Sequence, residues 1–341
     1  MKIYLHIMNY KFLCVVLFTL VLNSSAASPK YYELIYKAQN YLIDGNCELG
    51  LETYCNAFDL VELPHIEDIH NAILFTEKCG LKKFEKHIIK YLKKYSLNKS
   101  YLLWLSSKIK SSSLESLIKK HKEDPISKIQ VEFEELTKKD QSIRDSCKIN
   151  ITGSYEVDPK CTESIKRVDS MNLTYMQNLF KDSGLPNKNK FKNIGPVFSN
   201  SYTLILMHNQ AWGRDPFRDE LKEAVLALKI TPDYACSHLS YQNENSVNAK
   251  NFGANYHAIF NDNLYIFDDI QVPNLKSEIN QNRKSLYLDD LDSFLKRVKF
   301  QYENKNFKLV DYRLMETFNL SGEQGKLLEE KWKSAKVIFD N

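Results

Sequence analysis

Apolar residues recur at helical spacing through the first third of the chain. Between residues 31 and 95 they repeat every three or four positions, and the polar stretches between segments are short. This spacing predicts amphipathic helices, and short connections make consecutive helices antiparallel neighbours. The predicted helices cover residues 31–42, 48–60, 66–79, 81–95 and 101–117.

The first predicted hairpin carries small and aromatic residues where its two helices would meet. Ala38, Gly50 and Ala57 allow a close approach, and Tyr41 and Tyr54 would fill the gaps between them. These positions resemble the packing residues of a tetratricopeptide repeat. The second hairpin keeps the layout but loses most of this signature, and about three repeats are needed for a solenoid that stands alone. We therefore expect a tetratricopeptide-like module, residues 28–120, that leans on its neighbour and offers a concave face to a protein or peptide.

A polar linker, residues 121–127, separates this module from a second helical region, residues 128–341. Pro125 interrupts the helical periodicity there. Residues 255–260 and 264–267 flank a short polar turn, which is typical of a β-hairpin. The predicted helices of this region cover residues 128–147, 162–183, 199–210, 216–228, 232–238, 286–300 and 321–334. The expected fold class is mainly α, with helical hairpins followed by an α-rich α+β domain that contains one β-hairpin.

The first 27 residues follow a different pattern. Lys2 and Lys11 precede an uncharged apolar run at residues 12–22, and small residues follow as far as Ala27. This order is that of a secretory signal peptide, and the apolar run is shorter than the about 20 residues that span a bilayer. We expect cleavage after Ala26 or Ala27 and export to a periplasm or beyond, without a stable membrane anchor. A retained N-terminal anchor is the alternative.

The charge and cysteine content of the chain limit which classes of function are compatible with the sequence. The chain has 47 basic and 43 acidic residues, and both signs are spread along it, which argues against a nucleic-acid-binding surface. Of the seven cysteines only Cys14 lies in the leader, and no pair has C-x-x-C spacing. Cys147 and Cys161 bracket a polar, turn-rich loop and are the candidate disulfide. His65 and His70 are five residues apart, a spacing that does not place them on one helix face. We therefore expect surface or capping histidines and no metal there.

Four ionisable residues of the second region lie on or beside apolar helix faces. Asp140 lies in an apolar stripe four residues before Arg144, Asp169 flanks the stripe of the next helix, and His208 lies on an apolar side. A carboxylate on a core-facing stripe is costly unless it is paired. Asp140 and Arg144 therefore either neutralise each other or contact a partner from elsewhere. His208 is either a satisfied core histidine or a functional base.

A longer set of polar and small residues occurs in a recognisable order. The set is Asp140-x-x-x-Arg144, Asp169-x-x-Asn172, Gly184-x-Pro186, His208, Pro232-x-Tyr234-Ala235, Phe252-Gly253, Asp268 and Arg283-x-x-Leu286. It resembles an uncharacterised bacterial family, a domain of unknown function common in Bacteroidetes, over about residues 128–300. That family has an Asp-Arg pair where this chain has His238-Leu239, and a Gln-x-Tyr-Gly-Thr stretch where it has residues 250–254. The resemblance implies no substrate and no mechanism.

Two functions are compatible with the sequence. The first is a non-catalytic, exported binding or scaffold protein. We favour it because the chain has a repeat-like module and contains no G-x-S-x-G, no H-E-x-x-H and no phosphate-binding glycine loop. The alternative is a hydrolase-like enzyme. In that case His208 would be the general base, Asp140 or Asp169 would orient it, and Arg144 would bind an anionic group.

Three further residues would complete the binding site of such an enzyme. Asn172 follows Asp169 on the same predicted helix, and Tyr234 and His238 lie four residues apart on another. Polar groups on the inner faces of successive helices can converge on one pocket. Neither a cofactor nor a metal is expected. A pairing of Cys236 with His208 as nucleophile and base is a remote third option.

Overall fold

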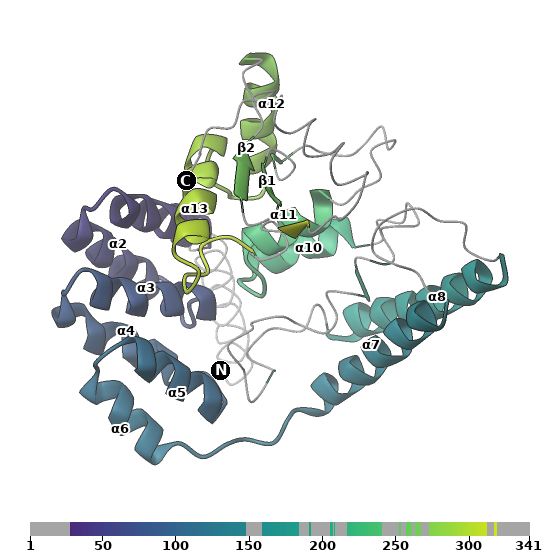
Figure 1. Ribbon diagram of the computed structural model, residues 1–341, viewed down its shortest axis with the longest axis horizontal. Coiled ribbons are helices and arrows are strands. Elements are labelled where there is room, and N and C mark those ends of the chain that lie inside the picture. Colours follow the sequence, from purple (N-terminus) through teal and green to yellow (C-terminus); the bar gives the residue numbers. More distant parts are fainter. Residues whose placement is uncertain are drawn as a thin grey trace, which may run out of the picture.

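The computed structural model describes residues 28–147, 159–183, 191, 205–206, 208, 217–240, 252–253, 257–260, 263–266, 273–311 and 317–318. These residues are mainly helical, as the hydrophobic periodicity predicts, and their strands form one small sheet (Figure 1). Within the described part of the chain, no helix is long and apolar enough to cross a membrane.

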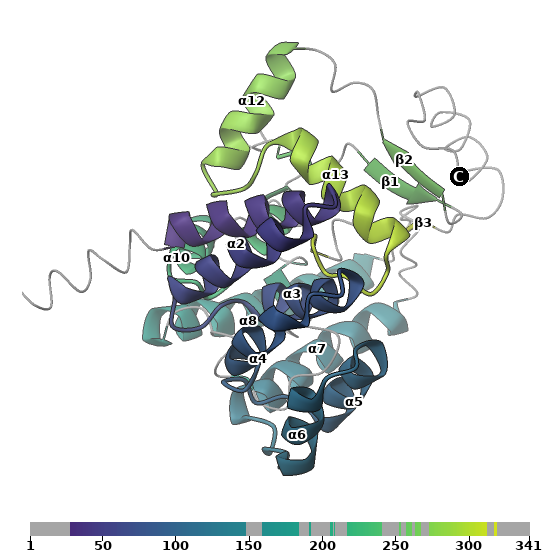
Figure 2. The ribbon, with the colours of Figure 1, turned by 90° about the vertical axis from the view of Figure 1, so that its left-hand side faces the viewer.

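The N-terminal part is a stack of short helices. It comprises a first helix at residues 28–43, α2 (Cys47–Asp59), α3 (Ile66–Lys78), a 3-10 turn η1 (Lys82–Phe84), α4 (Glu85–Leu92), α5 (Lys99–Lys108) and α6 (Ser112–Lys120). Figure 2 looks onto this stack, in which successive helices lie one beneath another. A Cβ atom at Gly50 would collide with Leu42, so the small residue allows the first two helices to approach. Gly45 has φ +80°, a left-handed conformation that glycine adopts at little cost where the first helix ends.

The predicted helix over residues 101–117 is wrong, because two helices occupy this stretch. α5 ends at Lys108 and α6 begins at Ser112. The Ser111 hydroxyl accepts a hydrogen bond from the backbone N–H of Leu114 at 3.0 Å and so caps the second helix. A serine side chain that competes for backbone donors favours such a helix start over an uninterrupted helix.

The second region begins with two long helices that lie side by side, α7 (Lys128–Ser146) and α8 (Pro159–Ser183). They are followed by α10 (Arg218–Leu226), α11 (Pro232–Ser240), α12 (Pro273–Lys284) and α13 (Leu291–Glu303). α12 was not predicted, and the helix predicted at residues 286–300 begins only at Leu291. Asp290 caps it by accepting a hydrogen bond from Ser293 N–H at 3.0 Å.

The small sheet has the strand order β2-β1-β3. β1 (His257–Phe260) pairs antiparallel with β2 (Asn263–Ile266), in a register that places His257 opposite Ile266. β3 (Thr317–Phe318) pairs parallel with β1. The turn of the expected hairpin, residues 261–262, lies outside the described residues. The same holds for the predicted helix at residues 321–334 and for most of the one at residues 199–210.

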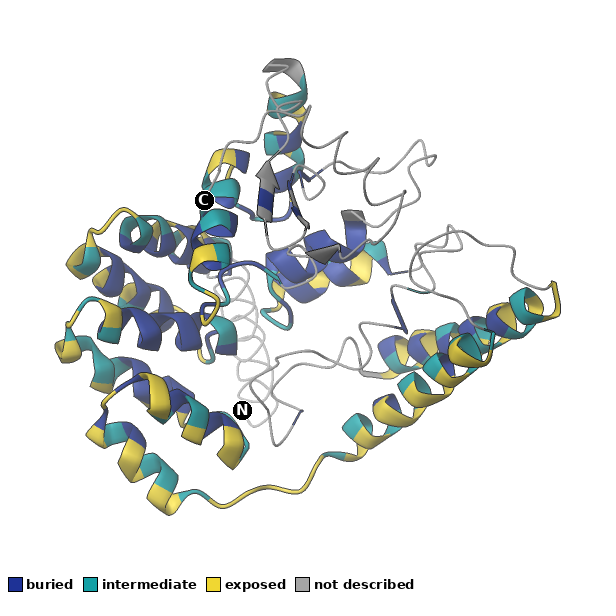
Figure 3. Ribbon diagram, in the orientation of Figure 1, coloured by how far each residue is buried: buried dark blue, intermediate teal, exposed yellow. Residues whose placement is uncertain are grey.

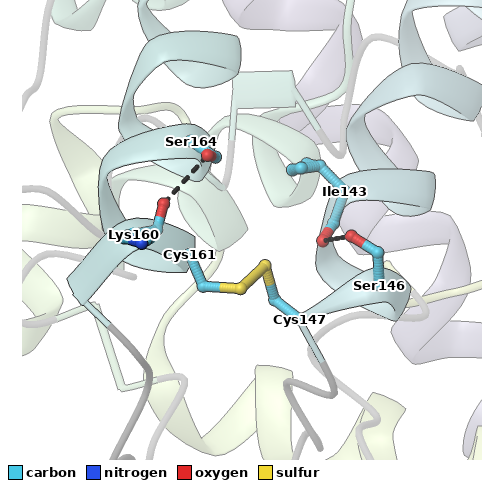
Figure 4. Close-up of a disulfide and its surroundings, with 6 residues drawn as sticks. All are labelled: Ile143, Ser146, Cys147, Lys160, Cys161 and Ser164. Carbon is cyan, nitrogen blue, oxygen red and sulfur yellow. Dashed lines mark hydrogen bonds between the residues drawn. A yellow bond between two sulfur atoms is a disulfide. The ribbon is translucent and has the colours of Figure 1, made fainter.

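Two disulfides link helices. The predicted bridge between Cys147 and Cys161 is confirmed, with a Cα–Cα distance of 5.7 Å, and it joins the end of α7 to the start of α8 (Figure 4). The second bridge, between Cys47 and Cys79, was not predicted and spans 32 residues from α2 to the end of α3. Cys55 is free and only partly buried.

The first helix packs directly against the second region. The Tyr32 hydroxyl donates to the carbonyl of Val225 at 2.7 Å, and the Tyr36 hydroxyl donates to the carboxylate of Asp233 at 3.2 Å. Figure 3 shows that buried positions dominate α11 and are frequent in α2 and α3, whereas α6 and α7 carry many exposed ones. One hydrophobic core therefore runs from the helical stack into the second region.

A chain segment that follows α13 is bound along α3. The side-chain amide of Asn71 donates to the carbonyl of Lys308 at 2.8 Å and accepts from the N–H of the same residue at 2.6 Å. A ring nitrogen of His70 lies 2.8 Å from the carbonyl oxygen of Asn306. The ring of Phe307 lies 4.4 Å from that of Phe75, centroid to centroid. This face of α3 is thus covered by the protein's own chain.

Of the two histidines at the start of α3, His65 has the expected capping position and His70 departs from expectation. His65 occupies the N-cap position, but it is buried and its ring stacks on Tyr32. His70 is also buried, with its ring stacked on Trp104 at 5.3 Å, so the expectation of a surface histidine is wrong. Burial lowers the pKa of His70 to about 4, because a charged imidazolium is poorly solvated there.

Candidate functional site

Four ionisable side chains meet between α7, α8 and residue 208. Asp140 and Arg144 lie one turn apart on α7, and Asp169 comes from the middle of α8. On α7 only Phe133 and Asp140 are buried, and their seven-residue spacing places both on the face turned to the interior. The pattern that makes this helix amphipathic therefore also carries a carboxylate into the protein.

Arg144 holds both carboxylates. Its Nη1 donates to Asp140 Oδ1 at 3.0 Å, and its Nη2 donates to the two oxygens of Asp169 at 2.9 and 3.0 Å. Asp140 and Arg144 thus form an intrahelical pair and also contact a partner from another helix, so both alternatives left open by the sequence hold. Pairing of this kind is what makes two buried carboxylates tolerable.

His208 lies at the other side of Asp140. Its Nδ1 is 2.8 Å from Asp140 Oδ2, which is an ion-pair distance. The amide nitrogen of Gln141 donates to the same oxygen at 2.8 Å. Asp140 is consequently contacted on one oxygen by Arg144 and on the other by His208 and Gln141.

Burial decreases outward through the cluster. The side chains of Asp140 and Asp169 are 0% exposed, that of Arg144 is 14% exposed, and that of His208 is 20% exposed. A chain of charged groups therefore runs from the interior to a histidine that solvent can reach. Such an arrangement differs from a sealed core network, in which every member is buried.

The electrostatics of Asp140 reflect its neighbours. Burial alone raises the pKa of its carboxyl group, but the contacts with His208, Arg144 and Gln141 outweigh burial and hold the pKa below its ordinary value of 3.8. Asp140 is therefore ionised at neutral pH. An ionised carboxylate beside Nδ1 favours the ring tautomer whose proton lies on that nitrogen.

The position of Arg144 bears on its predicted role. The sequence hypothesis was that it binds an anionic group of a ligand. In the structure its two terminal nitrogens are turned to the carboxylates of Asp140 and Asp169. In the structure, Arg144 fixes these two carboxylates relative to each other. Its positive charge also offsets part of their negative charge.

Asp140, Asp169 and His208 also have the composition of a metal-ligand set. One ligand-type atom from each lies within 4.8 Å of the others. The guanidinium group of Arg144, however, already bridges the two carboxylates. A divalent cation would have to displace it and would then leave the arginine without its partners. The residues present are better suited to a pair of carboxylates bridged by an arginine than to a metal centre.

The other three predicted site residues are also placed. Asn172 lies one turn after Asp169 on α8 and is buried. Tyr234 and His238 lie on α11, both buried, with ring centroids 4.8 Å apart. The structure therefore brings His208, Asp140, Arg144 and Asp169 into contact, and it places Asn172 one helical turn after Asp169. It describes Tyr234 and His238 as a ring pair on a separate helix.

Sequence reasoning missed two features. Gln141, next to Asp140 in the chain, carries no periodic signal that would mark it as a partner. The second feature is a buried ionic network around Arg297, which donates to Asp289 at 2.8 and 2.9 Å and to Asp233 at 3.3 and 3.4 Å. Arg283 joins it by donating to Asp289 Oδ1 at 2.9 Å. Because both arginines are fully buried, this network has the character of a structural core.

Comparisons with protein-family models, with curated proteins and with solved structures give no match to this chain. The resemblance to a bacterial family of unknown function therefore stays a prediction, and function has to be argued from the site.

Proposed function

We propose that this protein is a hydrolase-like enzyme in which His208 is the general base and Asp140 holds its ring. The observation that carries the proposal is the graded burial of the cluster, from two fully buried carboxylates to a histidine with 20% of its side chain exposed. A network needed only for stability gains nothing from ending at solvent. A base must reach the proton that it removes.

The two nitrogens of the imidazole would have different tasks. Nδ1 faces the ionised carboxylate of Asp140 at 2.8 Å, so it carries the ring proton. Nε2 is then the basic nitrogen. When Nε2 accepts a proton, the adjacent carboxylate stabilises the imidazolium that results, as in the aspartate and histidine pairs of known hydrolases.

Arg144 and Asp169 would serve as positioning residues. Asp140 can hold the imidazole in one orientation only if its own carboxylate is fixed, and Arg144 fixes it by bridging to Asp169 on the neighbouring helix. The Cys147–Cys161 disulfide ties the same two helices together close to this bridge. Preorganisation of this kind is what active sites require of the groups around the reacting residues.

The reaction class follows from the residues available. In hydrolysis, Nε2 of His208 takes a proton from water as the water oxygen attacks, and the proton is later given to the leaving group. We take water as the nucleophile in this proposal, since the described members of the cluster, His208, Asp140, Arg144 and Asp169, include no serine, threonine or cysteine. Arg144 is engaged with carboxylates and is not assigned to substrate binding.

The scaffold function that the sequence favoured stays a prediction. It rested on the concave face of a tetratricopeptide-like module. Asn71 and His70 on α3 contact Lys308 and Asn306 of the same chain, so this side of α3 is engaged within the protein. We propose that the module instead stabilises the second region, as the contacts of Tyr32 and Tyr36 also suggest.

Export is part of the proposal. Two disulfides and the lack of a membrane-crossing helix among the described residues are compatible with release to an oxidising compartment. The signal peptide at residues 1–27 and the membership in a bacterial family of unknown function are proposed on the sequence alone.

A turnover assay tests the proposed function. The full mature chain is assayed with p-nitrophenyl acetate, a p-nitroanilide amide, p-nitrophenyl phosphate and a p-nitrophenyl glycoside. The variant is His208→Gln, and the matched control is His87→Gln, which alters a partly exposed histidine on α4. We expect the wild type and the control to turn over at least one substrate, and H208Q to lose about 100-fold or more in kcat. Equal activity of H208Q and the wild type would rule out His208 as the base.

A further inference from the structure

Asn172 is a buried polar residue that the described contacts leave unexplained. The residue is 3% exposed, and its side-chain amide nitrogen has no hydrogen-bond partner among the residues that the structure describes. Leaving a buried amide donor unpaired destabilises a protein, because the donor loses its hydrogen bonds to water, and buried polar groups are hydrogen-bonded in the great majority of cases. An apolar side chain of similar size would avoid this cost. We therefore expect the amide at this position to donate a hydrogen bond to an acceptor on a bound ligand.

The position of Asn172 relates it to the candidate site. The buried positions of α8 include Ile165, Asp169, Asn172 and Met176, which follow one another along a single helix face. Asn172 is one turn beyond Asp169, and helical side chains lean towards the N-terminus of their helix. The side chain therefore leans towards the turn of Asp169, whose carboxylate lies within 4.8 Å of a ring nitrogen of His208.

The charge of the cluster limits what the acceptor can be. Among the residues that the structure describes, the carboxylates of Asp140 and Asp169 face one arginine, so these groups carry two negative charges and one positive charge when the imidazole is neutral. An anionic phosphate or carboxylate would be repelled at such a site. A neutral carbonyl oxygen, as in an ester or amide, accepts a hydrogen bond without adding charge.

We infer that Asn172 is a catalytic residue that binds the carbonyl oxygen of a neutral ester or amide substrate, an inference that rests on the proposed hydrolase function. Water attacks the carbonyl carbon while His208 accepts its proton, and the carbonyl oxygen becomes an oxyanion to which the Asn172 amide donates. The carbon–oxygen or carbon–nitrogen bond to the leaving group then breaks, and His208 returns the proton to that group. The products are a carboxylic acid and an alcohol or amine.

The test uses Asn172→Leu, which removes the donor and keeps a similar volume. We expect N172L to be at least as stable as the wild type, since no unpaired donor remains. We expect kcat for p-nitrophenyl acetate to fall about 100- to 1000-fold with little change in KM, which is the scale for loss of one oxyanion donor. A merely structural asparagine would give the reverse, with lower stability and unchanged kcat. Hydrolysis of p-nitrophenyl phosphate in place of the neutral esters would overturn the substrate class.

A second measurement separates this inference from the proposed function. In a ¹⁵N-labelled protein, the side-chain amide signal of Asn172 is identified by its loss in N172L and followed during titration with N-methylacetamide or inorganic phosphate. We expect a saturable shift with the neutral amide only. Activity lost in H208Q but retained in N172L would overturn the role of Asn172 alone. A shift without turnover of any substrate would support the binding site and overturn the hydrolase function. No shift with the amide would overturn the inference.

Discussion

Replacing Arg144 by methionine should destabilise the protein strongly. The substitution keeps most of the side-chain length but leaves Asp140 and Asp169, both 0% exposed, without the cation that bridges them. Removing one partner of a buried ion pair costs about 3–5 kcal/mol, because the remaining charge stays buried and uncompensated. The loss of stability should approach the upper end of this range, because two buried carboxylates lose their bridging cation instead of one.

The assay is urea denaturation of the full chain at neutral pH, followed by circular dichroism. Arg167→Met is the matched control, because Arg167 is an exposed arginine on α8. We expect the control to stay within about 0.5 kcal/mol of the wild type. Adding Asp140→Asn and Asp169→Asn to R144M should regain most of the loss, because the triple variant buries no net charge.

The effect of R144M should also depend on pH. The pKa of Asp140 is held below its ordinary value, so its contribution to stability is present above that value and is lost as the pH falls through the folded-state pKa. The difference between R144M and the wild type should therefore shrink in acid. If R144M unfolds at the same urea concentration as Arg167→Met, Arg144 does not hold the carboxylates and the described cluster is wrong.

Three other predictions concern different parts of the molecule. Burial raises the pKa of Asp68 to about 7, so its favourable contribution is complete below about pH 4 and falls as the pH rises to 7. Asp68→Asn should thus gain stability over the wild type between pH 4 and 8, by up to about 4 kcal/mol; a constant difference across these pH values, measured by thermal unfolding, would contradict the raised pKa. The double variant Cys147→Ser with Cys161→Ser should lose about 3 kcal/mol, the entropic scale for a loop of this size, and a variant as stable as the wild type in denaturation would show that the bridge is not formed in solution. Because Arg144 already bridges the carboxylates, EDTA should leave turnover unchanged, and a loss that a divalent cation restores would argue for a metal centre.

The helices that the sequence predicted best are those whose apolar stripe is continuous. α3 and α7 agree within a residue or two with the segments expected from periodicity. α12 was missed because its sequence is largely polar, with few apolar positions such as Leu275 and Ile279. The break between α5 and α6 depends on a local cap by Ser111, which competes with a helical pattern that otherwise continues.

The site was predictable only in part. The cost of placing Asp140 on an apolar stripe could be recognised from spacing, and it indicated that a partner was needed. The identity of that partner depends on how α7 pairs with α8 and on where residue 208 lies, which no local pattern encodes. The contact of Asn71 with Lys308 joins residues 237 positions apart and was beyond prediction for the same reason. The bridge between Cys47 and Cys79 likewise required the packing of two helices to be known.

The tautomer of the His208 ring tests the central claim most directly, because it needs no substrate. A ¹⁵N–¹H correlation spectrum of the histidine rings, with His208 assigned by its loss in H208Q, reports which nitrogen carries the proton. We predict a proton on Nδ1, facing Asp140 at 2.8 Å, and a free Nε2, with this preference weakened in Asp140→Asn. A neutral ring with its proton on Nε2 would leave no basic nitrogen towards solvent and would contradict the assignment of His208 as the general base.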